Sequence, residues 1–317
     1  MKLRPVLDGD FWLIGASPDL FSLGDTGGAP EHECVDHHVY QDVDGQWHLW
    51  GCIRRTCVGR ILYHWESDTL VQSPWRDTGT VIRVDRAAGE SLDDWNGEEW
   101  IQSPFVVRHS GSFYMYYGGH STARDAEGHP VPSGDPRTAC QMCLMISQDG
   151  REWTRYRNED GLSRLFVGPG ETRDPCVLKM GDCWYLYHAG YHDEDRAQAG
   201  FYVRTSHDLL QWSDWRLVHQ DRRYGPGPWD TECPLVVFRG GAYYLFRTEN
   251  YAAARTHVFR SEDPFDFGVG DARDHYVGSI AVAAPEIVVA DNGDEYITSN
   301  HDLRGGTMMC RLRWDTM

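Results

Sequence analysis

Residues 174–188 read DPCVLKMGDCWYLYH, which is a short apolar run, a turn with glycine and a second run rich in aromatic residues. The arrangement recurs as DHHVYQDVDGQWHLW (36–50), SPFVVRHSGSFYMYY (103–117), ECPLVVFRGGAYYLF (232–246) and PEIVVADNGDEYITS (285–299). Two apolar runs joined by such a turn predict a β-hairpin. One hairpin repeated at long intervals is typical of an array of similar sheets.

A third apolar run follows each hairpin, as in GRILYHWES (59–67) and AGFYVRTS (199–206), and turns ending in Trp153 and Trp212 indicate a fourth, outer strand. No convincing helical periodicity is present, so we predict an all-β, five-bladed β-propeller of four-stranded antiparallel blades. The blades start near residues 33, 100, 172, 230 and 283, and without a linker they form a single domain over 1–317. A β-sandwich or two smaller β domains is the alternative, but neither would repeat one hairpin five times.

The composition excludes several classes of partner. With 48 acidic and 30 basic residues the chain has a net charge of −18, so we expect no binding to nucleic acid or to anionic membranes. The N-terminal residues lack the apolar stretch of a signal peptide, which predicts a cytoplasmic protein. Nine cysteines, an odd number, are interpreted as buried thiols. The 13 Trp and 16 Tyr residues suit a core and a carbohydrate-binding surface.

Three of the hairpins open with an acid, namely Asp36, Asp174 and Glu232. In a propeller the first strands line the central channel and run in one direction, so we expect these acids at matching positions around one mouth of the channel. Converging carboxylates repel each other and are costly to bury, so the fold does not need them. One protonated and one ionised carboxylate is the pattern that glycoside hydrolysis requires. Any one of them alone could equally be an acid that caps a turn.

The motifs around two of these acids resemble known families. Thr172-Arg173-Asp174-Pro175 resembles the Arg-Asp-Pro motif, and Thr231-Glu232-Cys233-Pro234 the Glu-Cys-Pro motif, of the five-bladed furanosidase families 32 and 68. Glu232-Cys233-Pro234 is also similar to the general-acid segment of family 43, and Asp36 is spaced from its turn glycine like the first-blade acid of these families.

This resemblance implies a role for each residue. Asp36 would be the nucleophile or the general base, and Glu232 the general acid. Asp174 would hydrogen-bond the ring hydroxyls and adjust the pKa of the general acid, and Arg173 would fix the position of Asp174. Asp36 is followed by His37 rather than by the proline of family 32, and the chain has no room for a C-terminal β-sandwich, so we expect a single-domain relative of families 43, 62, 68 or 117.

Other polar and aromatic residues are candidates for substrate binding. The second strand of each hairpin runs back toward the channel mouth that holds the acids, so residues at its end can contact a substrate there. Residues at the start of a first strand, or just before it, lie at the same mouth. The candidates are Gln102, His120, Arg173, His188, Trp229 and His301. Glu33, Glu249 and Glu286 are rival acids. No HxH or HExxH spacing assigns a metal ligand, so we expect no required cofactor, although a structural cation could lie on the channel axis. Loops near 76–99 and 120–138 would cover the site or contact a second subunit.

These features lead to one functional hypothesis and two alternatives. The hypothesis is a glycoside hydrolase that removes a terminal fructofuranosyl or arabinofuranosyl unit from a small oligosaccharide or chain end. A transglycosylase or phosphorylase on the same scaffold is the second hypothesis, with Arg54, Arg55 and the candidate histidines as phosphate ligands. A non-catalytic sugar-binding propeller is the third.

Overall fold

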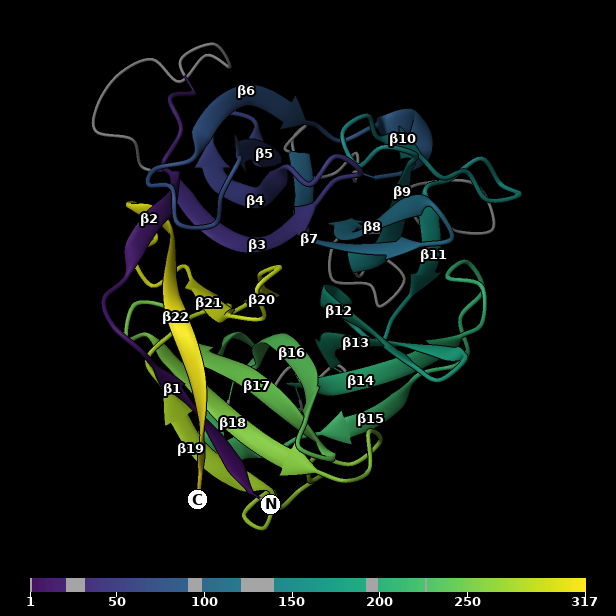
Figure 1. Ribbon diagram of the computed structural model, residues 1–317. Helices are drawn as coiled ribbons and strands as arrows, with labels where there is room; N and C mark the ends of the chain where they lie inside the picture. Colours follow the sequence, from purple (N-terminus) through teal and green to yellow (C-terminus); the bar gives the residue numbers. More distant parts are fainter. Residues whose placement is uncertain (1, 21–31, 91–98, 121–139, 192–198, 226) are drawn as a thin grey trace.

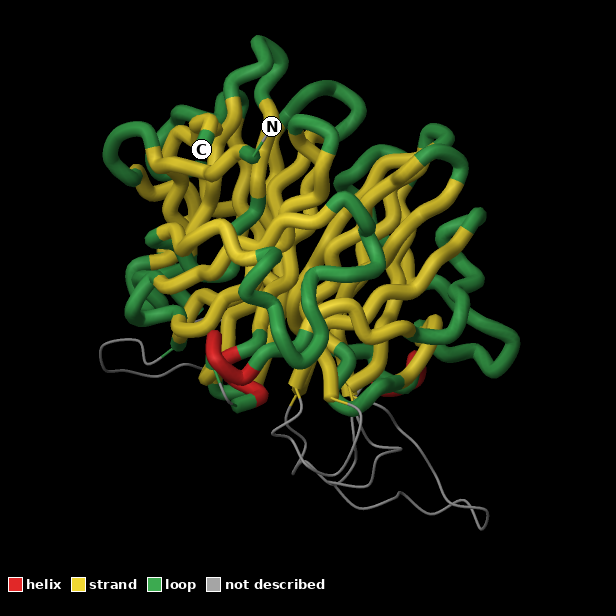
Figure 2. Tube along the Cα trace, turned by 90° about the horizontal axis from the view of Figure 1, so that it is seen from below, coloured by secondary structure: helices red, strands yellow, loops and turns green. Residues whose placement is uncertain are grey.

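The chain is arranged as antiparallel groups of strands around a common centre (Figure 1). The computed structural model describes residues 2–20, 32–90, 99–120, 140–191, 199–225 and 227–317. Within these ranges regular structure consists of strands and a few 3-10 turns, which confirms the all-β prediction. Figure 2 shows the strands running between two ends of the molecule, with 3-10 turns at one end.

Each group follows the predicted order of a hairpin and further antiparallel strands. The first contains β3 (Glu33–Gln41), β4 (Trp47–Thr56), β5 (Gly59–Ser67) and β6 (Arg76–Ile82). The second contains β7 (Glu99–His109), β8 (Ser112–His120), β9 (Cys140–Ser147), β10 (Thr154–Arg155) and β11 (Arg164–Val167), five strands rather than the predicted four. A short parallel pairing of β7 with β5 joins these two groups into one nine-stranded sheet. The third contains β12 (Arg173–Met180), β13 (Cys183–Tyr191), β14 (Ala199–Ser206) and β15 (Arg216–His219). The fourth contains β16 (Glu232–Arg239), β17 (Ala242–Asn250), β18 (Arg255–Ser261) and β19 (Tyr276–Ile280).

The last group joins the two ends of the chain. It contains β20 (Ile287–Val289), β21 (Glu295–Ser299) and β22 (Gly306–Thr316), together with β1 (Leu3–Leu7) and β2 (Trp12–Ala16) from the N-terminal residues. Both N-terminal strands pair antiparallel with β22. This pairing was absent from our prediction, because strands almost 300 residues apart leave no local signal in the sequence.

The hairpin turns are as predicted. The turn glycines Gly45, Gly111, Gly181, Gly241 and Gly293 have φ between 62° and 86°, the left-handed region that glycine enters without steric cost. Arg76–Ile82, which we expected within a loop, forms β6, while residues 91–98 and 121–139 lie outside the described residues.

The core lies between neighbouring groups. One buried cluster joins Tyr116 of β8, Leu186 of β13 and Phe246 of β17, and other clusters fill the spaces beside the first group. The first strands β3, β7, β12, β16 and β20 lie nearest the common centre (Figure 1). β3 contacts β7, β7 contacts β12 and β12 contacts β16, so residues near the start of these strands meet. No helix in the described ranges is long and apolar enough to cross a membrane.

Candidate active site

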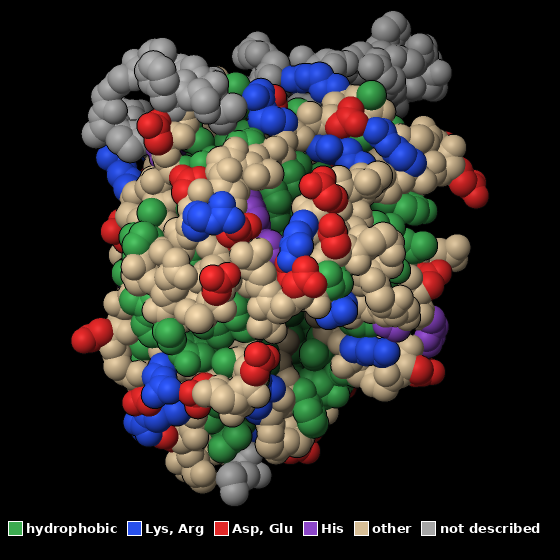
Figure 3. All heavy atoms as spheres, turned by 45° about the horizontal axis from the view of Figure 1, so that its top comes forward, with side chains coloured by type: hydrophobic (Ala, Val, Ile, Leu, Met, Phe, Trp, Pro, Cys, Tyr) green, Lys and Arg blue, Asp and Glu red, His purple; other side chains and the backbone are tan. Residues whose placement is uncertain are grey.

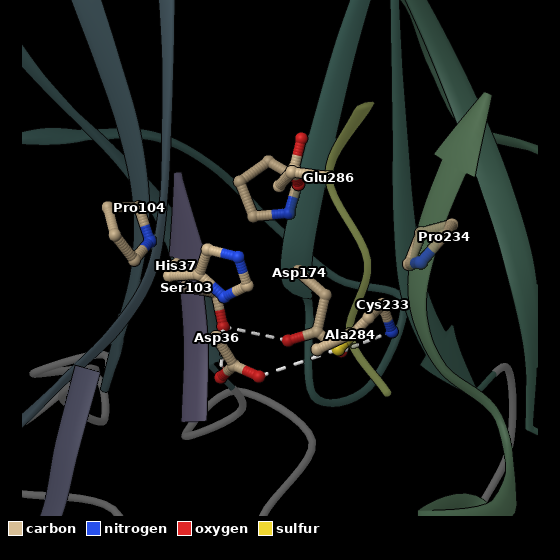
Figure 4. A pocket seen from close by; sticks show the side chains of 10 residues that line it. Asp36, His37, Ser103, Pro104, Asp174, Cys233, Pro234, Ala284 and Glu286 are labelled. Atoms are coloured by element: carbon tan, nitrogen blue, oxygen red, sulfur yellow. Dashed lines mark hydrogen bonds between the residues drawn. The ribbon is translucent and has the colours of Figure 1, made fainter. Parts of the chain in front are cut away.

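A β-bulge recurs near the start of the inner strands. Ser103, Asp174 and Cys233 have φ of 53°, 57° and 53°, each precedes a proline, and the strand register shifts at each of them. A bulge bends its strand and redirects the side chain at that point. Together with Asp36, at the register shift of β3, and Ala284, which precedes Pro285, these residues line one central cavity (Figure 4).

This register corrects our prediction that the acids occupy matching positions. Asp174 is equivalent to Ser103 and Cys233, whereas Glu232 lies one residue earlier and is equivalent to Arg173 and Gln102. The acids nevertheless converge. Asp36, Asp174 and Glu232 all line a second pocket beside the central cavity, and Gln102, Arg173 and Trp229 line it with them.

Ser103 bridges two of the carboxylates. Its Oγ lies 2.8 Å from Asp36 Oδ2 and 2.8 Å from Asp174 Oδ1. A hydroxyl has a single proton to donate. Both contacts are satisfied when Ser103 donates to Asp36 and a protonated Asp174 donates to Ser103. The bridge therefore favours different protonation states for the two carboxyl groups.

Other donors hold Asp36 in the ionised state. Tyr251 donates to Asp36 Oδ1 at 2.5 Å, and the Cys233 thiol donates to the same oxygen at 3.4 Å. Burial raises the pKa of Asp36, but the hydrogen bonds from Tyr251 and Ser103 and the charge of Arg60 outweigh burial and hold it below its ordinary value. Asp36 is thus the ionised carboxylate of the pocket.

The other two carboxyl groups are shifted in the opposite direction. Burial, together with the negative charge of Asp36, raises the pKa of Asp174 to about 6. Burial also raises the pKa of Glu232 to about 8; the charge of Arg173 opposes this shift, and those of Asp174 and Asp36 add to it. Arg173 Nη2 lies 3.4 Å from Glu232 Oε1. The Glu232 side chain is 19% exposed, so a protonated Glu232 remains within reach of a ligand.

Three of the predicted binding residues lie at this pocket. Trp229, 54% exposed, lies in a 3-10 turn (Pro228–Asp230) with its ring 5.1 Å from the Arg173 guanidinium carbon. Gln102 accepts a hydrogen bond from Arg60, whose guanidinium carbon lies 4.0 Å from the centre of the Trp100 ring. An apolar ring face and planar donors are what binding of a sugar ring and its hydroxyls requires.

The predicted histidines are placed differently. His188 is fully buried between Phe166 and Tyr202 and has no exposed surface for a ligand, which contradicts its predicted role. His301 packs against Phe11 and forms a hydrogen bond with Ser299. It is not among the described residues that line either pocket. His120 ends β8, and its side chain lies outside the described residues.

The rival acids have other partners. Glu33 forms ion pairs with Arg54 and Arg55. Glu286 lines the central cavity, where its Oε2 lies 3.2 Å from His38 Nδ1, and burial raises its pKa. Glu249 pairs with Arg255 and His257. None of these three acids belongs to the described lining of the pocket that contains Glu232.

Sequence reasoning missed Arg60, Trp100 and Tyr251 in the site, and it missed the hydrogen bonds of Ser103 and Cys233 to the carboxylates. A signal for two of them was present, because Ser103-Pro104 and Cys233-Pro234 share the residue-proline pattern of Asp174-Pro175. Arg60, Trp100 and Tyr251 lie outside the hairpin openings and reach the pocket only through the fold. Asp36, Asp174 and Cys233 also place ligand atoms within 4.8 Å of one another, close enough to hold a cation.

We expect Tyr251→Phe to move the acid limb of the pH profile. Because the lost hydrogen bond favours the ionised form of Asp36, its removal raises the Asp36 pKa. Hydrogen bonds to charged groups contribute about 1.5–3 kcal/mol, so the acid limb of kcat/KM should move up by about 1 to 2 pH units. Tyr63→Phe is the matched control, since Tyr63 donates to Asp77 at 2.6 Å outside the site. Equal profiles for the two variants would contradict this role.

The comparisons with known proteins agree with this geometry. The family model described as "Glycosyl hydrolases family 32 N-terminal domain" matches residues 43–264, more than half of the chain. The protein therefore belongs to glycosyl hydrolase family 32 and is a glycoside hydrolase. This confirms the resemblance to a group of families that includes 32, although the residue after Asp36 and the absence of a C-terminal β-sandwich had led us to expect another of these families. The match includes Asp174 and Glu232 and begins after Asp36. No curated protein matches the sequence.

Solved structures show the same propeller fold. A thermostable family-43 glycoside hydrolase has a TM-score of 0.56 at 19% identity, over 92% of this chain and 91% of that one. The GH32 β-fructofuranosidase of Bombyx mori has a TM-score of 0.60 at 17% identity, over 89% of this chain and 60% of that one. A GH43_1 enzyme from Xanthomonas citri has a TM-score of 0.58 at 14% identity, over 89% and 88%.

Proposed function

We propose that the protein hydrolyses a terminal furanoside, with Asp36 as the ionised carboxylate and Glu232 as the general acid. The observation that carries the proposal is the opposite shift of two carboxyl pKa values in one pocket, downward for Asp36 and to about 8 for Glu232. Environments that separate two carboxyl groups in this way assign one as acid and the other as base or nucleophile.

Each remaining residue of the pocket has a role in this proposal. Glu232 protonates the departing oxygen, while Asp36 attacks the anomeric carbon or activates a water. Asp174, held by Ser103 and by the Cys233 backbone N–H at 3.1 Å, is placed to hydrogen-bond ring hydroxyls. Hydroxyl contacts that strengthen as the ring flattens toward an oxocarbenium ion lower the barrier. No cofactor is needed in this scheme.

The substrate proposed is a fructofuranosyl unit at the end of a small oligosaccharide. The family-32 model supports it, and the Bombyx mori neighbour, which is a β-fructofuranosidase, was also solved in complex with sucrose. An arabinofuranosyl unit is the second candidate, because a neighbour from a bovine ruminal metagenomic library is an exo-1,5-α-L-arabinanase. Both candidates fit a pocket with Trp100 and Trp229 in its wall.

For the architecture, we propose that the antiparallel groups are the five blades of one propeller domain over residues 1–317. The pairing of β1 and β2 with β22 supports this, because it joins the ends of the chain in the last group. A ring of blades closed in this way leaves only short sheet edges exposed.

A product assay tests the proposed function. We expect release of free fructose or arabinose from sucrose, short fructans or short arabinans, at a rate independent of inorganic phosphate. Turnover only with phosphate would make the protein a phosphorylase. Saturable sugar binding without any product from these substrates would contradict hydrolysis and favour a sugar-binding propeller.

A further inference from the structure

A buried histidine pair lies in the first group, apart from the acids. His48 of β4 and His64 of β5 are 1% and 7% exposed. The register pairs His48 with Glu66 and Trp50 with His64, so these side chains share one face of the sheet. His48 Nδ1 lies 2.8 Å from His64 Nε2, and Glu66 completes a set of ligand atoms within 4.8 Å of one another. None of the three lines the pockets described above.

The partner of His48 fixes its tautomer. His48 Nε2 lies 3.1 Å from Asp42 Oδ2, and an ionised carboxylate can only accept. Nε2 therefore carries the proton. In the neutral ring Nδ1 presents a lone pair toward His64.

The partners of His64 favour a lone pair on its Nε2, which faces His48. Thr78 Oγ1 donates its single proton to the His64 carbonyl at 3.0 Å and accepts the Thr80 N–H at 3.1 Å. It can still accept from His64 Nδ1, which lies 3.0 Å away. With the proton on Nδ1, His64 Nε2 is bare. Two bare nitrogens then face each other, an arrangement that a cation between them would stabilise.

We propose that His48 Nδ1, His64 Nε2 and the Glu66 carboxylate bind a divalent transition-metal cation of the zinc type. Imidazole and carboxylate are zinc ligands, and Asp42 and Thr78 supply the outer hydrogen bonds that orient ligating histidines. Zinc–nitrogen bonds of about 2.0–2.1 Å at a tetrahedral angle place the nitrogens roughly 3.3 Å apart, so binding opens the pair by about 0.5 Å.

The ion would enter from the side of Glu66. Arg76 pairs with Oε1 of Glu66 and is itself 65% exposed, so Oε2 remains for the metal and the entry path is short. A bound ion would cross-link β4, which carries His48, to β5, which carries His64 and Glu66. A proton shared by the two nitrogens is the competing occupant, so metal binding displaces any such proton and weakens at low pH.

Metal titration of the chelator-treated protein tests the site. We expect the wild type to bind one more equivalent of Co²⁺ than His64→Gln, with the d–d absorption of a four-coordinate site of mixed nitrogen and oxygen ligands, and Zn²⁺ to raise the Tm of the wild type only. His207→Gln is the control, because His207 is exposed and lies directly after β14, in the third group of strands rather than the first. Equal metal equivalents for the wild type and His64→Gln would overturn the proposal.

A second variant keeps the test independent of folding. Glu66→Gln retains both histidines, and we expect it to bind Co²⁺ at least tenfold more weakly. Since Asp36, Asp174 and Cys233 also lie close enough to hold a cation, the titration is repeated in Asp36→Asn, where the equivalent assigned to the histidines must persist. Loss of all Co²⁺ binding in Asp36→Asn, with Glu66→Gln unchanged, would place the metal in the active site and overturn the proposal.

Discussion

Glu232→Gln is expected to lower turnover on sucrose or short fructans by about 10²- to 10⁴-fold, the range that removal of a general acid gives. The amide keeps the size of the side chain and cannot protonate the departing oxygen. Nitrophenyl glycosides have leaving groups that need little protonation, so their turnover should fall much less. We measure kcat on both substrate types. If Glu232 is the general acid, the loss of kcat on sucrose or fructans exceeds the loss on nitrophenyl glycosides.

A matched control separates this effect from a change in fold. Glu262 is 76% exposed and pairs with Arg260 at the surface, so Glu262→Gln should retain wild-type rates on both substrates. Equal losses for poor and good leaving groups in Glu232→Gln would contradict the acid assignment and leave Glu232 as a substrate-binding residue.

Asp36→Asn is expected to lower kcat by about 10³-fold or more on every substrate, because neither attack on the anomeric carbon nor activation of water proceeds without the carboxylate. Leaving-group ability should not rescue it, in contrast to Glu232→Gln. The amide oxygen can still accept the hydrogen bond of Tyr251, and the amide NH2 can donate to Ser103 Oγ, so we expect sugar binding to persist. Calorimetry with the unreacted substrate measures that binding.

Asp208→Asn is the control for Asp36→Asn. Asp208 is an exposed turn residue whose carboxylate accepts hydrogen bonds from the backbone of Leu210 and Gln211, and it is not among the residues that line either pocket. Its substitution should leave kcat unchanged. Retention of wild-type turnover in Asp36→Asn would remove this residue from the chemistry and make Glu286 the next acid to test.

The surface agrees with a neutral carbohydrate as partner. Acidic and basic side chains are interspersed on the face drawn in Figure 3, without a continuous basic patch. The aromatic and arginine side chains that line the pocket with the acids are Arg54, Arg60, Trp100, Arg173, Trp229 and Tyr251.

The sequence allowed the hairpins and their order to be predicted, because alternating apolar residues and turn glycines are local signals. It also allowed the convergence of Asp36, Asp174 and Glu232 to be predicted, since repetition alone brings the starts of inner strands together. The one-residue offset between Asp174 and Glu232 was missed. It follows from a bulge at Asp174 and Cys233, where a strained backbone, not residue spacing, decides the direction of the side chain.

The remaining errors have a common cause. His188 has the position in its strand that we expected, but it packs into the core beside Tyr202, and periodicity does not reveal which neighbour covers a side chain. Tyr251 and Arg60 reach the pocket through contacts between segments far apart in the chain, and β1 pairs with β22 in the same way. Contacts between segments far apart in the chain were therefore the part that the sequence pattern left undetermined.

The pH dependence of kcat/KM, measured for the wild type and for Glu232→Gln, tests the central claim that Asp36 is ionised while Glu232 is protonated at neutral pH. Because the acid must carry its proton, wild-type kcat/KM should fall as pH rises through about 8, the pKa of Glu232. In Glu232→Gln this alkaline fall should vanish, while the acid limb set by Asp36 remains. An alkaline limb that persists unchanged in Glu232→Gln would contradict the assignment of Glu232 as the acid.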